Sequence, residues 1–168
     1  MSHFNEERVV KKILIILCFV FTCGGLYANE NLPGQCENTS EEEVIGEINR
    51  ANKTWAISTF RNLCSLWKKK EAVAMAAVKK NGWALQYVDP NIEGYRKIVL
   101  AAVKQDGKAL KFVNTNVKGY RKIVLAAVKQ NFKALEFVNT NVKGYRKIVL
   151  GAVKQNYRAF KFVDPKVK

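Results

Sequence analysis

The sequence has few of the side chains on which most catalytic and metal sites depend. It holds one histidine, His3, and four cysteines among 168 residues, and its 14 acidic residues are outnumbered by 29 lysines and arginines. Serine is sparse in the second half, no glycine-rich phosphate loop occurs, and no cluster has metal-ligand spacing. We therefore predict that the protein is not an enzyme and has no catalytic residues, no metal site and no cofactor.

Long apolar runs are also missing. The run ILIILCFVFTC over residues 13–23 is shorter than the roughly 20 apolar residues of a spanning helix. Two lysines precede it, and two glycines and Leu-Tyr-Ala follow it, which is typical of a secretory signal at residues 1–28. We predict cleavage after Ala28 and a secreted or periplasmic protein. An uncleaved membrane anchor is one alternative, and a lipoprotein with its lipid on Cys23 is another.

Two cysteines, Cys36 and Cys64, and no histidine are left after such a cleavage. In an oxidising compartment two cysteines favour one disulfide, which could stabilise the fold by about 3 kcal/mol. The alternative is that both thiols stay free, because a disulfide needs the two Cα atoms close together. A cysteine nucleophile without histidine lacks its usual base, which again argues against an enzyme.

The second half of the chain is a tandem repeat of 25 residues. Residues 98–122 and 123–147 differ at only three positions, and residues 73–97 are a more divergent copy. Residues 148–168 are a fourth copy that stops before its Gly-Tyr-Arg-Lys. Such self-similarity predicts a repeat architecture. The predicted organisation is a signal peptide at 1–28, a loop at 29–39, an N-terminal cap of one long or two short helices at 40–69, and four repeats at 70–168.

Apolar residues within each repeat follow the period of a helix. In the second copy Tyr95, Val99 and Val103 recur at i, i+4 and i+8, on one helical face. A single pair of short helices cannot bury such a face, whereas stacked pairs can. We therefore predict an all-α fold, a short α-solenoid of helix-turn-helix repeats. The columns expected in its core are Ala77, Ala102, Ala127 and Ala152; Val78, Val103, Val128 and Val153; Leu85, Leu110, Leu135 and Phe160; Val88, Val113, Val138 and Val163; and the tyrosines Tyr95, Tyr120 and Tyr145.

Capping residues indicate where the long helix of each repeat begins and ends. Asp89-Pro90 places an acid before a proline, which is a common signature of a helix start. The helix should end near Asp106 and its equivalents, since Asn and Asp tolerate the left-handed conformation of a helix C-terminus. We expect a second, shorter helix after that turn, and we expect Gly94 and its equivalents to bend the linker to the next repeat.

The fourth copy keeps the apolar pattern without a capping helix after it. Solenoids usually end in a repeat whose outer face is polar, but residues 148–168 place Phe160 where the other copies have leucine. Exposed apolar surface at this end would favour a partner. Three outcomes stay open: weak end-to-end pairing of two chains, a cap supplied by another protein, or fraying of the last helix. Like charges oppose the pairing, so added salt should strengthen it.

The first repeat resembles a known family of bacterial and eukaryotic repeats. The run KKEAVAMAAVKKNGWALQY at residues 69–87 has a charged start, an Ala-Val-Lys helix end, an Asn-Gly turn and an Ala-Leu second helix. These features are similar to a unit of the family catalogued as domain of unknown function 4116. The resemblance covers roughly residues 69–168, and the later copies depart from it where Gly-Tyr-Arg-Lys replaces a more acidic unit start. It implies a helical tandem repeat and no activity, so no catalytic residue is carried over.

Positive charge is concentrated in the repeats and is periodic. Residues 68–168 hold 23 of the 29 lysines and arginines but six of the 14 acids. Packed helices stand about 10 Å apart, close to one Debye length in physiological salt, so ladders of like charge should raise a positive potential along one side. The ladders selected as candidate contacts for an anionic partner are Lys79, Lys104, Lys129 and Lys154; Arg96, Arg121 and Arg146; and Lys97, Lys122 and Lys147.

Two functions from different classes fit these features. The favoured one is an exported, non-catalytic scaffold that binds another protein. The alternative is a binder of anionic surfaces or polymers, such as acidic lipid, lipopolysaccharide or nucleic acid, through the basic ladders. Nucleic acid is the least favoured of these, because export separates the chain from most of it. The ladders could also be a solvated face that only keeps the repeats soluble.

Overall fold

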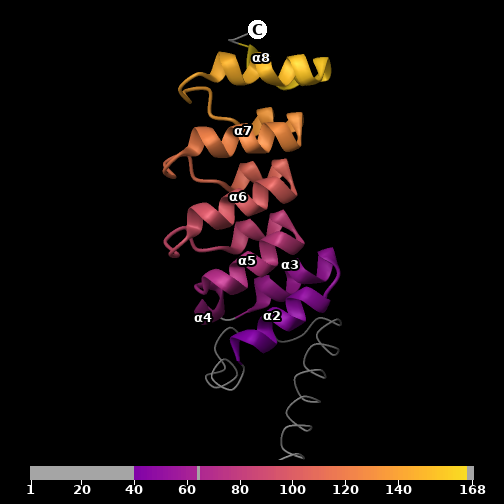
Figure 1. Cartoon of the computed structure of the whole chain (residues 1–168), viewed down its shortest axis with the longest axis vertical. Helices are drawn as coiled ribbons and strands as arrows, with labels where there is room; N and C mark the ends of the chain where they lie inside the picture. Colours follow the sequence, from indigo (N-terminus) through magenta and orange to yellow (C-terminus); the bar gives the residue numbers. More distant parts are fainter. Residues whose placement is uncertain (1–39, 64, 166–168) are drawn as a thin grey trace, which may run out of the picture. The chain divides into compact units, whose positions relative to one another are not determined.

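The computed structural model describes residues 40–63 and 65–165, and all regular structure in these residues is helical, with no strand (Figure 1). The predicted all-α class is thereby confirmed. The predictions for the export signal, for the loop at 29–39, and for the pair Cys36 and Cys64 fall on residues outside the described ones.

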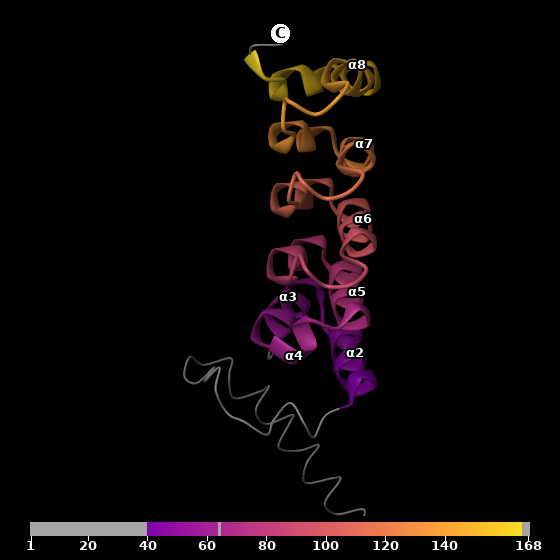
Figure 2. The same cartoon turned by 90° about the vertical axis from the view of Figure 1, so that its left-hand side faces the viewer.

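Each repeat folds as an α-helix followed by a short 3-10 helix. The α-helices stack in sequence order, as Figure 1 shows, and the 3-10 helices form a second column beside them (Figure 2). The sequence predicts a short second helix, and six residues of 3-10 geometry fill that place. The four pairs are α5 (Glu71–Lys80) with η1 (Gly82–Tyr87), α6 (Tyr95–Gln105) with η2 (Gly107–Phe112), α7 (Tyr120–Gln130) with η3 (Phe132–Phe137), and α8 (Tyr145–Gln155) with η4 (Tyr157–Phe162).

The segment before the repeats holds α2 (Glu41–Arg50), α3 (Lys53–Asn62) and the single turn α4 (Ser65–Lys68). A capping box begins α2, because the Ser40 hydroxyl accepts from the Glu43 N–H (3.2 Å) and the Ser40 N–H donates to the Glu43 carboxylate (3.1 Å). α2 packs against α5, and α3 packs against η1. The two helices therefore extend the two columns that the repeats form.

α2, the first of the described helices, is buried on one side only, a pattern that end repeats of solenoids show. In α6 both members of the neighbouring pair Ile98-Val99 are buried, because this helix packs between α5 and α7. α2 has two neighbouring pairs of this kind, but in each of them the first residue is a glutamate. Only the second residue of each pair is buried. Burial raises the pKa of Glu47, and the nearby Arg50 opposes the rise. The two pairs in α2 are Glu43-Val44 and Glu47-Ile48.

The long helices begin later than the sequence predicts. α6 begins at Tyr95, and its N-cap residue is Gly94 with a φ of 77°, a conformation that favours glycine. Asp89 does not cap this helix. Its carboxylate accepts from the N–H of Asn91 (2.9 Å) and closes a turn in the loop. The glycine column therefore supplies a left-handed residue at the start of α6, α7 and α8, and it does more than bend the linker.

The helix ends also differ from the prediction in their local geometry. Asp106 is extended, with a φ of −146°, and is not left-handed. Its Oδ1 accepts from the N–H of Lys108 (2.9 Å), so its side chain caps the 3-10 helix that follows. The equivalent Asn81, Asn131 and Asn156 are extended in the same way. The Asn/Asp column thus starts the second helix of each repeat.

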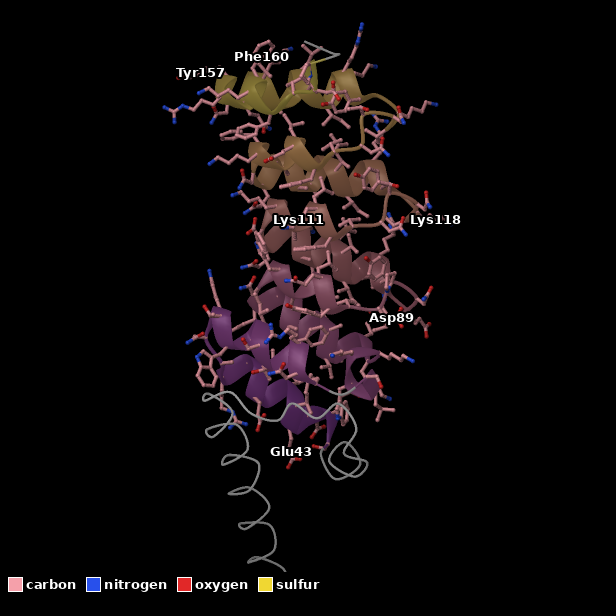
Figure 3. The ribbon with its side chains drawn as sticks, turned by 180° about the vertical axis from the view of Figure 1, so that it is seen from behind. Glu43, Asp89, Lys111, Lys118, Tyr157 and Phe160 are labelled. Atoms are coloured by element: carbon pink, nitrogen blue, oxygen red, sulfur yellow. The ribbon has the colours of Figure 1, made fainter. Side chains whose placement is uncertain are left out.

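The predicted core columns are confirmed except at the last repeat. All four alanines of the alanine column and all three tyrosines of the tyrosine column are buried. Val153 is only half-buried, however, and Phe160 is 51% exposed. Each repeat covers the one before it, and no described repeat follows η4 to cover Phe160. Figure 3 shows Phe160 and Tyr157 at this end of the stack.

Glutamine side chains tie neighbouring repeats together, which the sequence analysis did not predict. Gln105 accepts from the backbone N–H of Gly82, and Gln130 accepts from that of Gly107, both at 2.6 Å. Each bond joins the end of one α-helix to the start of the preceding 3-10 helix. The glutamine at the same place in each of the last three repeats is the signal that could have revealed this ladder.

Two of the three differences between the near-identical repeats are explained by Trp83 in the first repeat. Asp106 has two carboxylate oxygens and uses both, since Oδ1 caps η2 and Oδ2 accepts from the indole N–H of Trp83 (2.8 Å). The ammonium of Lys111 stands 4.7 Å from the centre of the same ring. The second repeat has Lys108 in the place of Trp83 and therefore offers no indole N–H to the third repeat. Asn131, the equivalent of Asp106 in the third repeat, needs only the one oxygen that caps η3.

We expect Asp106→Asn to destabilise the junction of the first two repeats by about 1–2 kcal/mol. In asparagine an NH2 group replaces one of the two oxygens, so when the remaining oxygen caps η2 the group that faces the indole N–H is a donor and cannot accept from it. Urea unfolding followed by tryptophan fluorescence would measure the loss. The same substitution in a Trp83→Phe background is the control and should cost less than about 0.5 kcal/mol. Equal costs in both backgrounds would contradict a role for the indole bond.

Candidate binding face

The ten selected basic residues are all exposed, but they do not form one surface. The lysines lie on the exposed arc of the α-helices. Arg96 and Arg121 lean toward the loop that precedes the next long helix. A Cβ added to Gly119 would stand 3.3 Å from the Arg96 side chain, and one added to Gly144 would stand 3.4 Å from that of Arg121. The loop lysines, such as Lys118 in Figure 3, belong to a separate region.

We call the exposed arc of α6, α7 and α8 the outer face. In α6 it consists of residues at i, i+3, i+4 and i+7, which lie on one side of an α-helix. The first and last of the four are lysines, and leucine and a small residue lie between them. The members of the outer face are Lys97, Leu100, Ala101 and Lys104 on α6; Lys122, Leu125, Ala126 and Lys129 on α7; and Lys147, Leu150, Gly151 and Lys154 on α8.

The leucine column of the outer face is the part that the sequence analysis missed. Leu125 is 44% exposed and Leu150 is 60% exposed, while Leu100 is half-buried. The sequence does contain a signal for this column, because Leu100 and its equivalents lie outside the helical stripe of Tyr95 and Val99 that is predicted to be the core. The outer face therefore combines two lysine ladders with an apolar strip between them.

The charge of the outer face is uncompensated along most of its length. Each of α6, α7 and α8 holds three lysines or arginines and no acid. Lys97 forms an ion pair with Glu71 of the preceding α5, at 3.7 Å between the Nζ and Oε1 atoms. Such exposed pairs contribute little to stability. Acidic residues gather instead at the other end of the stack, in the first turn of α2.

The buried tyrosines belong to the scaffold of the repeats. Burial raises the pKa of Tyr95 and that of Tyr120, so both phenols stay uncharged. The Tyr120 hydroxyl accepts from the backbone N–H of Asn139 (3.4 Å), which partly opposes the shift. The Tyr145 hydroxyl accepts in the same way from the N–H of Asp164 (3.3 Å). Tyr120 and Tyr145 thus join α7 and α8 to a later loop.

A pocket of about 300 Å³ lies between η3, η4 and the nearby loops. Its lining mixes apolar side chains with Glu136 and Lys161. Within residues 40–63 and 65–165, no three side chains of His, Cys, Asp or Glu come together as metal ligands would. In the same residues no helix has the length and apolar character to cross a membrane. The pocket offers no set of groups that suggests a reaction.

Comparison with known families agrees with this architecture. Residues 71–118 and 120–168 match the family described as Domain of unknown function (DUF4116). The chain belongs to this family. Each DUF4116 match spans about two of the 25-residue units, and the two matches together cover more than half of the chain. No curated protein and no solved structure matches this sequence. The description of DUF4116 names no activity.

Proposed function

We propose that this chain is an exported, non-catalytic repeat protein that binds an acidic protein partner with its outer face. One observation carries the proposal: the face presents six exposed lysines and no acid, with leucines between the two lysine ladders. Export rests on the signal-like pattern of residues 1–28. We therefore assign the selected lysines of α6–α8 to binding, whereas Arg96 and Arg121 lie beside the loops.

The leucine column favours a protein over a purely charged polymer. A partner that covers the outer face must match negative charge to the lysines and apolar groups to Leu125 and Leu150. Nucleic acid and acidic polysaccharide present dense charge, and much of their affinity is lost when salt is added. A protein surface can present both kinds of group close together. The binding of anionic polymers remains a second candidate, and the lysine ladders alone support it.

We expect four substitutions on the outer face, Lys122→Gln, Lys129→Gln, Lys147→Gln and Lys154→Gln, to weaken binding of poly-L-glutamate by about tenfold or more. Each lost surface ion pair contributes roughly 0.2–1 kcal/mol, and the four add up. Fluorescence anisotropy with labelled poly-L-glutamate would measure the affinity. Wild-type affinity should fall as salt rises from about 50 to 200 mM, because the contact is electrostatic.

The matched control removes the same charge from elsewhere. Lys118, Lys133, Lys143 and Lys161 are exposed on the loops and the 3-10 helices, away from the outer face. Their fourfold change to glutamine should weaken binding by less than about threefold, through net charge alone. If both sets of variants lose the same affinity, the positive charge acts diffusely and the outer face is not the binding surface.

A further inference from the structure

The outer face repeats its chemistry at a nearly constant interval. α6 and α7 have the same eleven residues, and α8 differs from them only at Gly151. Packed helices lie about 8–10 Å apart, so Leu100, Leu125 and Leu150 succeed one another at about that distance along the stack. A partner that contacts all three leucines must present equivalent apolar groups at the same interval.

An α-helix laid along the stack meets this requirement. It rises about 1.5 Å per residue, so every seventh residue recurs on one side after about 10.5 Å. An extended strand repeats a face after about 6.8 Å, which does not fit. A polyproline II chain repeats after about 9 Å, but it is usually held by aromatic grooves, and the strip between the ladders is leucine, alanine and glycine.

The lysine ladders set the width and the charge of the site. Lys97 and Lys104 are seven residues apart on α6, which places their Cα atoms about 10.5 Å apart along the helix axis. A helix with its side chains is about 10–12 Å across, so a helix seated on the leucines lies between the two ladders. Acidic side chains on both flanks of its apolar stripe would then reach lysines on both sides.

We infer that the outer face takes an acidic amphipathic helix that lies along the stack, with one apolar residue in every seventh position and Glu or Asp on both flanks. This inference rests on the proposed function and adds the secondary structure and the period of the partner. Docking of an amphipathic helix through a single apolar stripe is a common mode of peptide recognition. The lysines fix the charge of the partner, and the leucines fix its register.

An anionic bilayer is the alternative ligand for the outer face, because it also presents negative charge beside an apolar interior. A fluid surface needs no regular interval, however, so it gives no reason for three leucines at a constant spacing. Vesicles with about 30% phosphatidylglycerol therefore serve as a competitor in the experiment. All proteins compared carry the same residues 1–39, so that segment contributes equally to each.

The test uses stapled helical peptides of one to four heptads, each heptad with one leucine flanked by glutamates. Affinity of the full chain should rise roughly tenfold with each added heptad up to three and should then level off. α6, α7 and α8 supply three leucines, and a fourth heptad finds none on α5, which has Met75 there. A three-heptad peptide of the same composition with its leucines scattered should bind no better than one heptad.

A leucine substitution separates the inference from the proposed function. Leu125→Ser should weaken the three-heptad peptide about tenfold and leave poly-L-glutamate binding unchanged, since only the peptide has apolar groups. Leu66 in α4 is 53% exposed and off the outer face, so Leu66→Ser is the control and should change neither affinity. The exposure of Leu125 makes its replacement compatible with folding.

Three results would overturn the inference. If the regular and the scattered peptide bind equally well, the partner is not a helix with a seven-residue period. The proposed function would still stand in that case, provided that the lysine variants weaken poly-L-glutamate binding. Vesicles that bind through Leu125, and that the three-heptad peptide does not displace, would assign the outer face to lipid. Insensitivity of both probes to the lysine variants would overturn the proposed function as well.

Discussion

Replacing Ala127 with aspartate should abolish cooperative folding of the last two repeats. Ala127 is fully buried in α7, in the small-residue column where each long helix meets its neighbours. A carboxylate there has no room and no partner, and burying such a charge costs several kcal/mol. That penalty is comparable to the whole stability of a typical domain, about 5–15 kcal/mol. Thermal unfolding followed by far-UV circular dichroism would show the loss as a reduced helical signal and an early transition.

The control for this substitution is the adjacent residue. Ala126 belongs to the outer face and is half-buried, and the lysines of the same face surround it. Ala126→Asp should therefore lower stability by less than about 1 kcal/mol, mainly through the lower helix propensity of aspartate. If the melting curves of the two variants coincide, the alanine column does not lie in the core and the stacking of α6 on α7 is wrong.

The repeat made the packing of this protein predictable from sequence. A side chain that recurs every 25 residues has the same environment in each copy, so the periods of Val99 and Ala102 identified the buried face of every α-helix. The lysine ladders followed from the same periodicity. The sequence placed the leucine column outside the core stripe, but the repeat alone did not show how far each leucine is exposed, and this ranges from half-buried Leu100 to Leu150 at 60%.

Local geometry was harder to predict because the same residues serve more than one kind of turn. Asp89-Pro90 could begin a helix or close a loop turn, and the chain uses it for the loop. Asp106 could end one helix in a left-handed conformation or begin the next in an extended one. The six residues after it are too few for a helical period to distinguish a 3-10 helix from an α-helix. At Asp89 and Asp106 the side chain accepts from the backbone N–H two residues further on, so a local bond accompanies the conformation that is adopted.

Gly107 is a position where the next repeat limits which residue the chain can hold. A Cβ added to it would collide with the backbone carbonyl of Ala127 in the next repeat. The N–H of Gly107 also donates to Gln130 (2.6 Å), so the backbone cannot move away without losing that bond. The third repeat has Phe132 at the same place, where it contacts Phe162 with ring centres 5.9 Å apart. Gly82 has the same limit, because an added Cβ would stand 2.6 Å from the backbone oxygen of Ala102. The steric limit therefore holds at the first two junctions between repeats and not at the third, where Phe132 takes the place of glycine.

We expect Gly107→Ala to destabilise the protein by about 2–3 kcal/mol, because the added methyl group forces α7 away from η2. Gly151→Ala is the matched control, and its effect should have the opposite sign. Gly151 lies inside α8 with open space around it, and the other copies have Ala101 and Ala126 there. Alanine should stabilise α8 by about 1 kcal/mol through its helix propensity. Urea unfolding of the two variants measures both effects, and a Gly107→Ala protein as stable as wild type would show that the second and third repeats do not approach this closely.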